Sequence, residues 1–151
     1  MTFKYRVPRS YRMPARTGGV APAVEREVLT GEFQGQKASD DEERFLTRFQ
    51  RYCQTLYFRF ILGVKYMPGW LELDFLAVMR DNRIRAGEID DLTFVHKGQR
   101  EKSEAKIKDI KRMQYLSELG IVPYKGIEHI DAARLQTPEQ SDRTVREFAR
   151  S

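Results

Sequence analysis

Two long segments of the chain carry hydrophobic residues at steps of three and four, the spacing typical of a helix with one buried face. The first begins at Ser39-Asp40-Asp41-Glu42, a capping-box sequence that satisfies the free N–H groups of a first turn, and its pattern continues to Leu56. The second covers residues 99–119 and ends before Gly120, a residue suited to a helix C-terminus. A shorter helix is expected from Thr137, which precedes a proline at the first helical position.

Between the two long helices, and again after the second, the pattern predicts strands, whose successive side chains point to opposite faces. Asp81-Asn82 has the chemistry of a hairpin turn between two of them. The order of the elements predicts an α/β fold with a mixed central β-sheet flanked by helices. The strands are expected at residues 57–62, 71–78, 84–90 and 121–124.

Residues 1–38 carry closely spaced prolines and glycines, so we expect an extended, irregular arm there and a single domain over residues 39–151. The formal net charge is +5, and the five cations of residues 1–16 account for all of it because no acid lies among them. This basic arm either follows a phosphate backbone or is a flexible tail kept soluble by its charge. Its cations are Lys4, Arg6, Arg9, Arg12 and Arg16.

The composition favours a folded protein with a hydrophobic core and excludes a disulfide-rich one. Hydrophobic residues make up 40% of the chain, which is enough for a core, and charged residues make up 32%. The single cysteine, Cys53, cannot form an internal disulfide or a cysteine-based zinc site, and its place on the apolar face of the first helix predicts a small core residue. We find no membrane-length apolar run and no secretory signal, so we expect a cytoplasmic protein with no membrane contact and no organic cofactor.

Four carboxylates gather on the predicted hairpin. Glu72 and Asp74 point to one face of their strand, and Glu88 and Asp90 point together from the next strand. Like charges on neighbouring strands destabilise a sheet, so a cation must neutralise them. Either a divalent metal ion binds there, or the carboxylates form salt bridges with nearby basic residues. The candidates for such salt bridges are Arg59, Lys65 and Arg85.

The register of the hairpin decides whether these carboxylates meet. A two-residue turn at Asp81-Asn82 would place Asp74 opposite Ile89. A longer loop, or a bulge at Gly87, would place Asp74 opposite Glu88. The sequence leaves both registers open.

Cations follow the carboxylates along the chain, in residues 96–112. Acidic metal ligands walled by lysine and arginine suit phosphodiester hydrolysis, because a metal activates water while the cations hold the phosphate. The alternative is that the basic helix is simply a solvated face. The candidate DNA-binding cations of this helix are Arg100, Lys102 and Lys106.

Taken in order, these motifs resemble the PD-(D/E)XK nuclease superfamily, and especially the branch that contains very-short-patch-repair endonucleases. The resemblance covers about residues 40–125 and implies a restriction-endonuclease-like core. The matching residues are Asp74-Phe75, Glu88-Ile89-Asp90, His96, Lys106, Asp109, Arg112, Leu116 and Gly120, followed by Ile121-Val122.

The resemblance implies a site for Mg²⁺, or for Mn²⁺. Asp74 would be the central metal ligand, and Glu88 the second, together with the main-chain carbonyl of Ile89. Glu43 in the first helix would complete the metal shell, directly or through water. The alternative for Glu43 is a helix acid favoured only by the dipole of the first turn.

The resemblance departs from the superfamily at one position, because Asp90 stands where the usual motif has lysine. His96 and Lys97 are then the candidates that orient or deprotonate the attacking water, with Lys106 as a migrated lysine. We expect Asp109 and Arg112 to form ion pairs that brace the site. His129 lies outside these motifs and is taken as structural.

The leading expectation is therefore a metal-dependent endonuclease that cleaves branched, mismatched or nicked DNA, with a homodimer as a possible assembly. A second reading is a nucleic-acid-binding module in which Asp90 marks a site without catalysis. A third is a structural or interaction protein whose long N-terminal segment becomes ordered against a partner.

Overall fold

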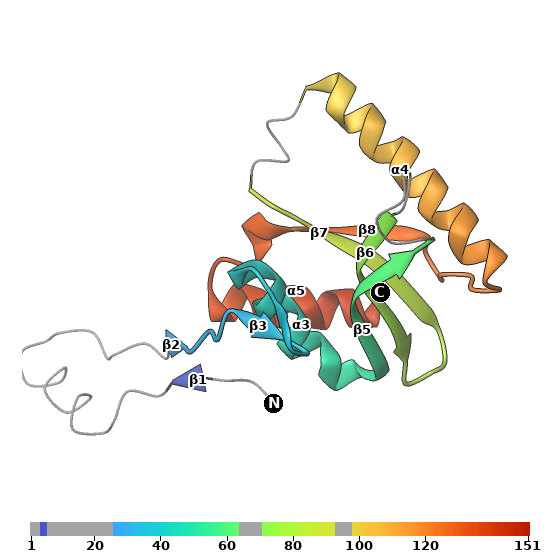
Figure 1. Cartoon of the computed structure of the whole chain (residues 1–151). Coiled ribbons are helices and arrows are strands. Elements are labelled where there is room, and N and C mark those ends of the chain that lie inside the picture. The colour runs from blue at the N-terminus through green and yellow to red at the C-terminus, as the bar shows by residue number, and fades with distance from the viewer. Residues whose placement is uncertain (1–3, 6–25, 64–70, 93–97) are drawn as a thin grey trace, which may run out of the picture.

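The computed structural model describes residues 4–5, 26–63, 71–92 and 98–151, and its centre is a four-stranded mixed sheet (Figure 1). The strands lie in the order β5-β6-β7-β8, with β5, β6 and β7 antiparallel and β8 parallel to β7. Helices flank this sheet, so the predicted α/β fold with a mixed central sheet is confirmed. The strands are β5 Cys53–Leu62, β6 Leu71–Met79, β7 Ile84–Asp90 and β8 Ile127–Asp131.

Among the described residues, α3 (Asp40–Phe49) and α5 (Pro138–Arg150) cover one face of the sheet, and α4 (Gln99–Glu118) covers the other (Figure 1). Two of these helices begin where their capping sequences predict. Ser39 accepts from the Glu42 N–H at 3.2 Å, and Thr137 caps α5 in the same way. None of the helices in the described ranges has the length and apolar character needed to cross a bilayer.

Aromatic side chains form the core under α3 and α5. The rings of Phe45, Phe49, Phe75 and Phe148 contact one another in every pairing, with centroids 5.1–6.0 Å apart. The first three are fully buried. Burying each such ring contributes on the order of 2 kcal/mol, and edge-to-face contacts add to this, so the cluster ties both helices firmly to the sheet.

The apolar side chains of β5 and β6 change from one face of the sheet to the other at one point along the strands. Phe58 and Phe75 pack into the core under α3 and α5, whereas Phe60 and Leu73, two residues away, pack toward α4. Arg59, which lies between the two β5 residues, has a left-handed φ of 56°, which turns the strand. The apolar side chains of β6 therefore divide between two cores.

The first helix is shorter than its hydrophobic spacing predicts. α3 ends at Phe49, the 3-10 turn η1 (Gln50–Tyr52) follows, and β5 begins at Cys53. Residues up to Leu56 join the strand because pairing with β6 satisfies their backbone groups while Cys53 and Leu56 still reach the same core. Cys53 is buried, as expected, and burial raises the pKa of its thiol to about 12.

The last strand also lies elsewhere than predicted. Residues 121–124 carry no strand, and β8 begins only at Ile127. Pro123 has no N–H to give to a ladder, and its carbonyl accepts from the Gly126 N–H in a turn. Gly120, with a φ of 75°, ends α4 as its position predicts.

The β6–β7 hairpin takes the second of the two predicted registers. The Met79 N–H donates to the Arg83 carbonyl at 2.8 Å, which leaves a three-residue loop with Asn82 in the left-handed conformation at φ 71°. Phe75 then pairs with Gly87. Asp74 therefore lies opposite Glu88, the arrangement that brings the two carboxylates together.

Residues 26–38, predicted to belong to the irregular arm, pack against the domain. Phe33 enters the aromatic core, and the side chains of Gln34 and Gln36 bond backbone groups of β5 along its outer edge. Short pairings order this segment: β1 (Lys4–Tyr5) with β2 (Arg26–Glu27), and β3 (Glu32–Phe33) with β4 (Gln36–Lys37).

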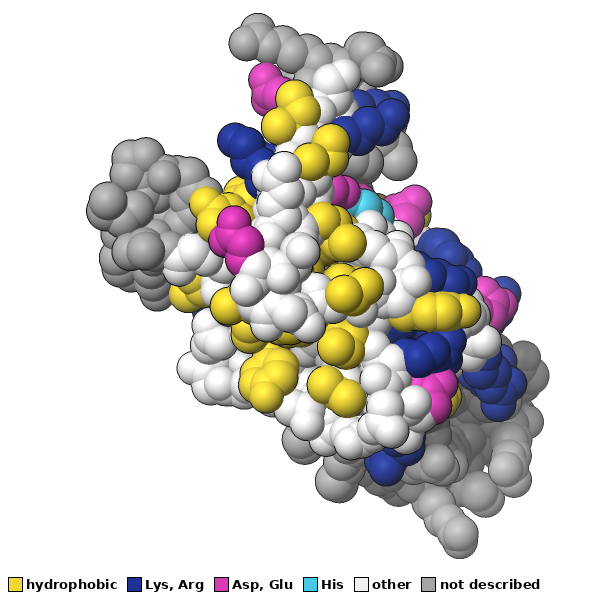
Figure 2. All heavy atoms as spheres, turned by 90° about the vertical axis from the view of Figure 1, so that its right-hand side faces the viewer, with side chains coloured by type: hydrophobic (Ala, Val, Ile, Leu, Met, Phe, Trp, Pro, Cys, Tyr) yellow, Lys and Arg dark blue, Asp and Glu magenta, His cyan; other side chains and the backbone are white. Residues whose placement is uncertain are grey.

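The apolar face predicted for α4 is only partly buried. Leu116 is fully buried against the sheet, but Ile107 and Ile110 are 52% and 59% exposed. The N-terminal part of α4 extends beyond the sheet, and hydrophobic side chains are visible on that face of the molecule (Figures 1 and 2).

Candidate functional site

The candidate site lies where β6 and β7 separate. Beyond the Phe75–Gly87 pair, side chains replace the backbone ladder. The Glu88 carboxylate accepts from the Asp74 backbone N–H at 2.7 Å, and the Asp74 carboxylate accepts from the Ile89 N–H at 2.7 Å. The two carboxylates predicted to meet are therefore inserted between the strands.

Both carboxylates bind a proton more tightly than they would in water, mainly because they are buried. Burial raises the pKa of Asp74 to about 6, and the charge of Glu42 acts in the same direction against the Ile89 N–H. Burial and the charge of Asp74 raise the pKa of Glu88 to about 8, although Arg112 opposes the shift. At neutral pH Glu88 therefore mostly keeps its proton, and the pair is a place where a proton or another cation is favoured.

Arg112 of α4 is the cation that contacts this pair. One Nη lies 2.5 Å from Glu88 Oε1, the other lies 2.8 Å from Asp109 Oδ1, and Nε donates to the Glu72 carbonyl at 3.2 Å. The side chain is buried, so these bonds fix α4 over the strands. The ion pair predicted between Asp109 and Arg112 is present.

His129 of β8 extends the cluster across a third strand. It lies opposite Glu88 in the parallel pairing, with Nδ1 3.0 Å from Asp90 Oδ2 and Nε2 2.6 Å from Asp109 Oδ2. Its bond to Asp90, and then that to Asp109, raise the pKa of His129 to about 9 against the opposing effect of burial. The protonated ring therefore joins two carboxylates.

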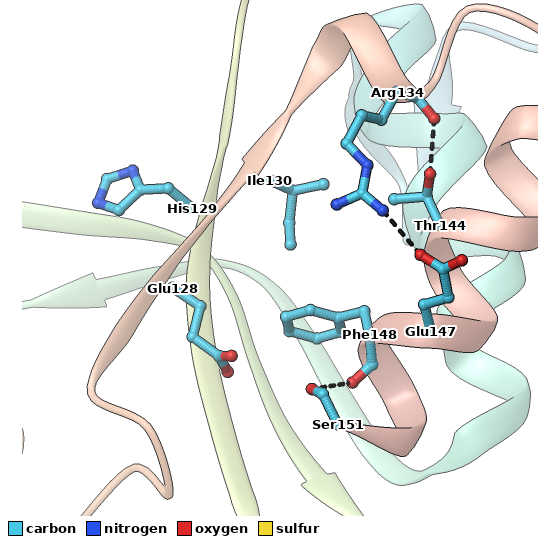
Figure 3. Close-up of a pocket in the computed structure, with 8 residues that line it drawn as sticks. All are labelled: Glu128, His129, Ile130, Arg134, Thr144, Glu147, Phe148 and Ser151. Carbon is cyan, nitrogen blue, oxygen red and sulfur yellow. Dashed lines mark hydrogen bonds and ion pairs between the residues drawn. The ribbon is translucent and has the colours of Figure 1, made fainter.

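Sequence reasoning missed His129 because the last strand was expected at residues 121–124, too early to bring this residue beside Asp90. The signal that could have identified it is Ile127-Glu128-His129-Ile130, a short strand with a polar residue facing α4. Figure 3 shows the ring of His129 on one side of β8, while Ile130 lies on the other side, in a pocket with Phe148.

Glu43 is placed apart from these groups. Its carboxylate is 1% exposed and accepts from the backbone N–H groups of Thr30 and Gly31 at 2.9 and 2.7 Å, which fastens residues 26–38 to α3. Glu42, one position earlier on the helix, is the acid whose charge acts on Asp74. One residue turns a helix by about 100°, so neighbouring acids face different surroundings.

The predicted salt bridges are formed by only some of the carboxylates. Arg59 forms an ion pair with Glu72 at 3.2 Å, whereas Arg85 forms its ion pair with Glu128, at 2.7 Å. Asp74 forms no ion pair with any residue that the structure describes. Lys65 lies outside the described residues.

The remaining predicted residues are placed only in part. Lys106 is exposed and Lys102 half-buried on α4, on the side of the molecule that carries the cluster. Lys4 lies in β1 and Arg100 in α4, but their side chains are not among those described. Outside the described residues lie His96, Lys97, Arg6, Arg9, Arg12 and Arg16.

The donor set is suited to a hard cation held by few protein ligands. Among the described residues, no three histidine, cysteine, aspartate or glutamate side chains gather into a complete metal cage. Asp74, Glu88 and the carbonyl of Ile89 are hard oxygen donors, and Mg²⁺ is commonly held by one or two carboxylates with water and substrate phosphate. These residues therefore fit Mg²⁺ bound jointly with a phosphate.

We compared the chain with protein-family models, with curated proteins and with solved structures, and found no match in any of them.

Proposed function

We propose that the protein is a metal-dependent endonuclease of the PD-(D/E)XK type that hydrolyses DNA phosphodiester bonds. The observation that carries the proposal is the pair Asp74 and Glu88, held opposite each other between β6 and β7. Both are largely buried and both have raised pKa values, so they lack enough positive charge around them. A site built for a divalent cation has this property before its ion binds.

In this proposal Asp74 and Glu88 hold Mg²⁺ or Mn²⁺, with the Ile89 carbonyl as a third donor. The ion would activate a water molecule and balance charge on the phosphate. The backbone N–H groups of Asp74 and Ile89 keep the two carboxylates in place. His96, Lys97 and Lys106 remain the proposed groups for orienting or deprotonating the water.

Two further residues gain a role beside the pair. Arg112 contacts Glu88 from α4, and His129 adds a second positive charge next to Asp90. We assign both to positioning, because their hydrogen bonds are already made to protein groups. Lys102 and the cations of residues 1–16 would contact the DNA backbone, whose phosphates bind lysine and arginine through counterion release.

A second candidate function is a nucleic-acid-binding module without catalysis. The ion pair between Arg112 and Glu88 favours it, because a guanidinium 2.5 Å from the carboxylate supplies charge that a metal ion would otherwise supply. In this case Asp74 and Glu88 would be structural, and DNA affinity would not depend on a metal ion.

The test is cleavage of four-way junction, mismatched, nicked, single-stranded and plain duplex DNA, each with Mg²⁺, Mn²⁺ or EDTA. We expect metal-dependent cutting that D74N and E88Q abolish while DNA affinity is retained. Glu118→Gln is the matched control, because Glu118 is an exposed carboxylate at the end of α4, and this variant should cut normally. Absence of cutting by folded wild-type protein on every substrate would favour the binding module.

The proposal extends to location and assembly. An enzyme that acts on cellular DNA works inside the cell, in the cytoplasm or at the nucleoid. Two active sites held together can cut both strands of a duplex in one binding event, so we propose a homodimer for that reaction. Sedimentation analysis with and without DNA checks this step.

A further inference from the structure

A second charged site lies on the other side of the sheet. α3, the turn η1 and α5 enclose a pocket of about 230 Å³ at the surface. These elements pack on the face of the sheet opposite α4, so the pocket is separate from the carboxylate cluster (Figure 1). Its lining residues are Arg48, Arg51, Tyr52, Asp142, Val145 and Arg146.

Arg48 is a buried guanidinium with one unsatisfied group. It is 2% exposed; its Nε donates to Asp142 at 2.6 Å, and its Nη1 donates to the Arg44 carbonyl and pairs with Glu27. Its Nη2 has no acceptor among the described residues. A buried charged donor without a partner is costly, so an acceptor supplied by a ligand would be favoured here.

Two more arginines line the same pocket. Arg51 extends from η1 and Arg146 from α5; both are exposed, and neither forms an ion pair with a residue in the described ranges. Asp142 is the one carboxylate of the lining, and Arg48 already engages it. The pocket is therefore positively charged, and Tyr52 places an aromatic side chain at its edge.

We propose that this pocket binds a phosphate group, presented either by the DNA backbone or by a small phosphorylated molecule. Guanidinium groups match the geometry of phosphate oxygens and bind them with charge-assisted hydrogen bonds. The volume is sufficient for one phosphate and part of its ester. The pocket shares no residue with the proposed nuclease centre, so this proposal does not depend on the proposed function.

The test uses the full-length protein and two probes, inorganic phosphate and a short DNA duplex, with binding followed by calorimetry. The variant is R51Q/R146Q, because both side chains are exposed and the fold does not depend on them. Arg48 is left intact, since its truncation would break the ion pairs with Glu27 and Asp142. R143Q is the control, an exposed arginine of α5 outside this pocket.

We expect saturable phosphate binding that weakens about tenfold in R51Q/R146Q, a loss equivalent to about 1.4 kcal/mol, and is unchanged in R143Q. If the DNA backbone supplies the phosphate, the duplex also binds R51Q/R146Q more weakly than the wild type. The slope of log affinity against log salt concentration then falls by about two in magnitude. If only phosphate binding weakens, the ligand is a small phosphorylated molecule. Non-saturable phosphate binding, or equal binding by wild type and R51Q/R146Q, overturns the proposal.

Discussion

A proton, the Arg112 guanidinium and a divalent cation would compete for the carboxylates of Asp74 and Glu88. A proton can bind there because both pKa values are raised, Arg112 already approaches Glu88, and a divalent cation would bind there in the proposed function. The outcome depends on pH, because protons and metal ions exclude each other from the same carboxylates. Stability measurements on the protein without metal therefore report on the proposed site before any activity is known.

We predict that the metal-free protein loses stability as pH rises from about 5 to 9. Glu88 has a pKa of about 8 in the folded protein, against 4.5 as its ordinary value, so the folded state binds a proton that the unfolded chain releases. His129, raised from 6.5 to about 9, acts in the same direction at higher pH. Urea unfolding in EDTA at pH 5, 7 and 9 measures the loss.

Single substitutions distinguish the contributions of Glu88 and His129 to the pH dependence of stability. E88Q should remove the part of the pH dependence between about pH 5 and 8, which we expect to be on the order of 4 kcal/mol. H129Q should remove the part between about pH 6.5 and 9. Added Mg²⁺ should stabilise the wild type more at pH 8.5 than at pH 6, because fewer protons must be displaced. An E88Q protein with the wild-type pH profile would contradict this assignment.

At the scale of the elements, Gly87 allows β7 to lie close to both its neighbours. A Cβ at this position would lie 2.6 Å from the Glu128 carbonyl of β8 and 2.6 Å from the Phe75 ring of β6. Neither group can move away easily, because one belongs to the backbone ladder and the other to the aromatic core. The residue before Glu88 therefore sets the strand spacing at the site.

We predict that G87A lowers the free energy of unfolding by about 2 kcal/mol or more, since overpacking a filled core has this typical cost. Urea denaturation measures it. G120A is the comparison: Gly120 has a φ of 75° with nothing within 4 Å of the added methyl, so only backbone strain of about 1 kcal/mol is expected. Equal losses in the two variants would show that steric contact at Gly87 is unimportant.

The sequence predicted elements whose capping or pairing chemistry is local. The starts of α3 and α5, the end of α4 and the β6–β7 hairpin all depend on neighbouring residues such as Ser39 and Gly120. The predicted boundary between the first helix and β5 was wrong because the hydrophobic residues from Cys53 to Leu56 fit the spacing of a helix and also that of a strand. Only pairing with β6, distant in sequence, decides between them.

The candidate site was predictable in part for the same reason. Alternation along two strands brought Asp74 and Glu88 to one place, and only the loop length, which the sequence left open, fixed their register. His129 was missed because β8 contributes a parallel edge strand whose position depends on a crossover. The turn at Arg59 depends on a left-handed conformation for a residue that rarely adopts one.

At the scale of the whole molecule, the excess positive charge lies at the N-terminus, and the domain is close to neutral. The five cations of residues 1–16 equal the formal net charge of +5. In the proposed complex with DNA, long-range attraction would therefore come mainly from the arm, and the domain would supply local contacts.

Deletion of residues 1–16 tests this division. We predict weaker DNA binding and a fall of up to about 4.5 in the slope of log affinity against log salt concentration, because each of the five cations contributes about 0.9. Fluorescence anisotropy over a range of salt concentrations measures the slope. The same slope before and after deletion would mean that the arm only keeps the protein in solution.

The parallel strand β8 also determines when the site forms during folding. β5, β6 and β7 are joined by short connections, whereas β8 reaches its place beside β7 only after the chain has passed through α4. Contacts between residues distant along the chain carry the largest loop-closure cost and form late. Asp90, Asp109 and His129 come from the two strands and the helix of this crossover, so they meet in its final step. A chain arrested before that step would keep its antiparallel hairpins and lack the charged cluster.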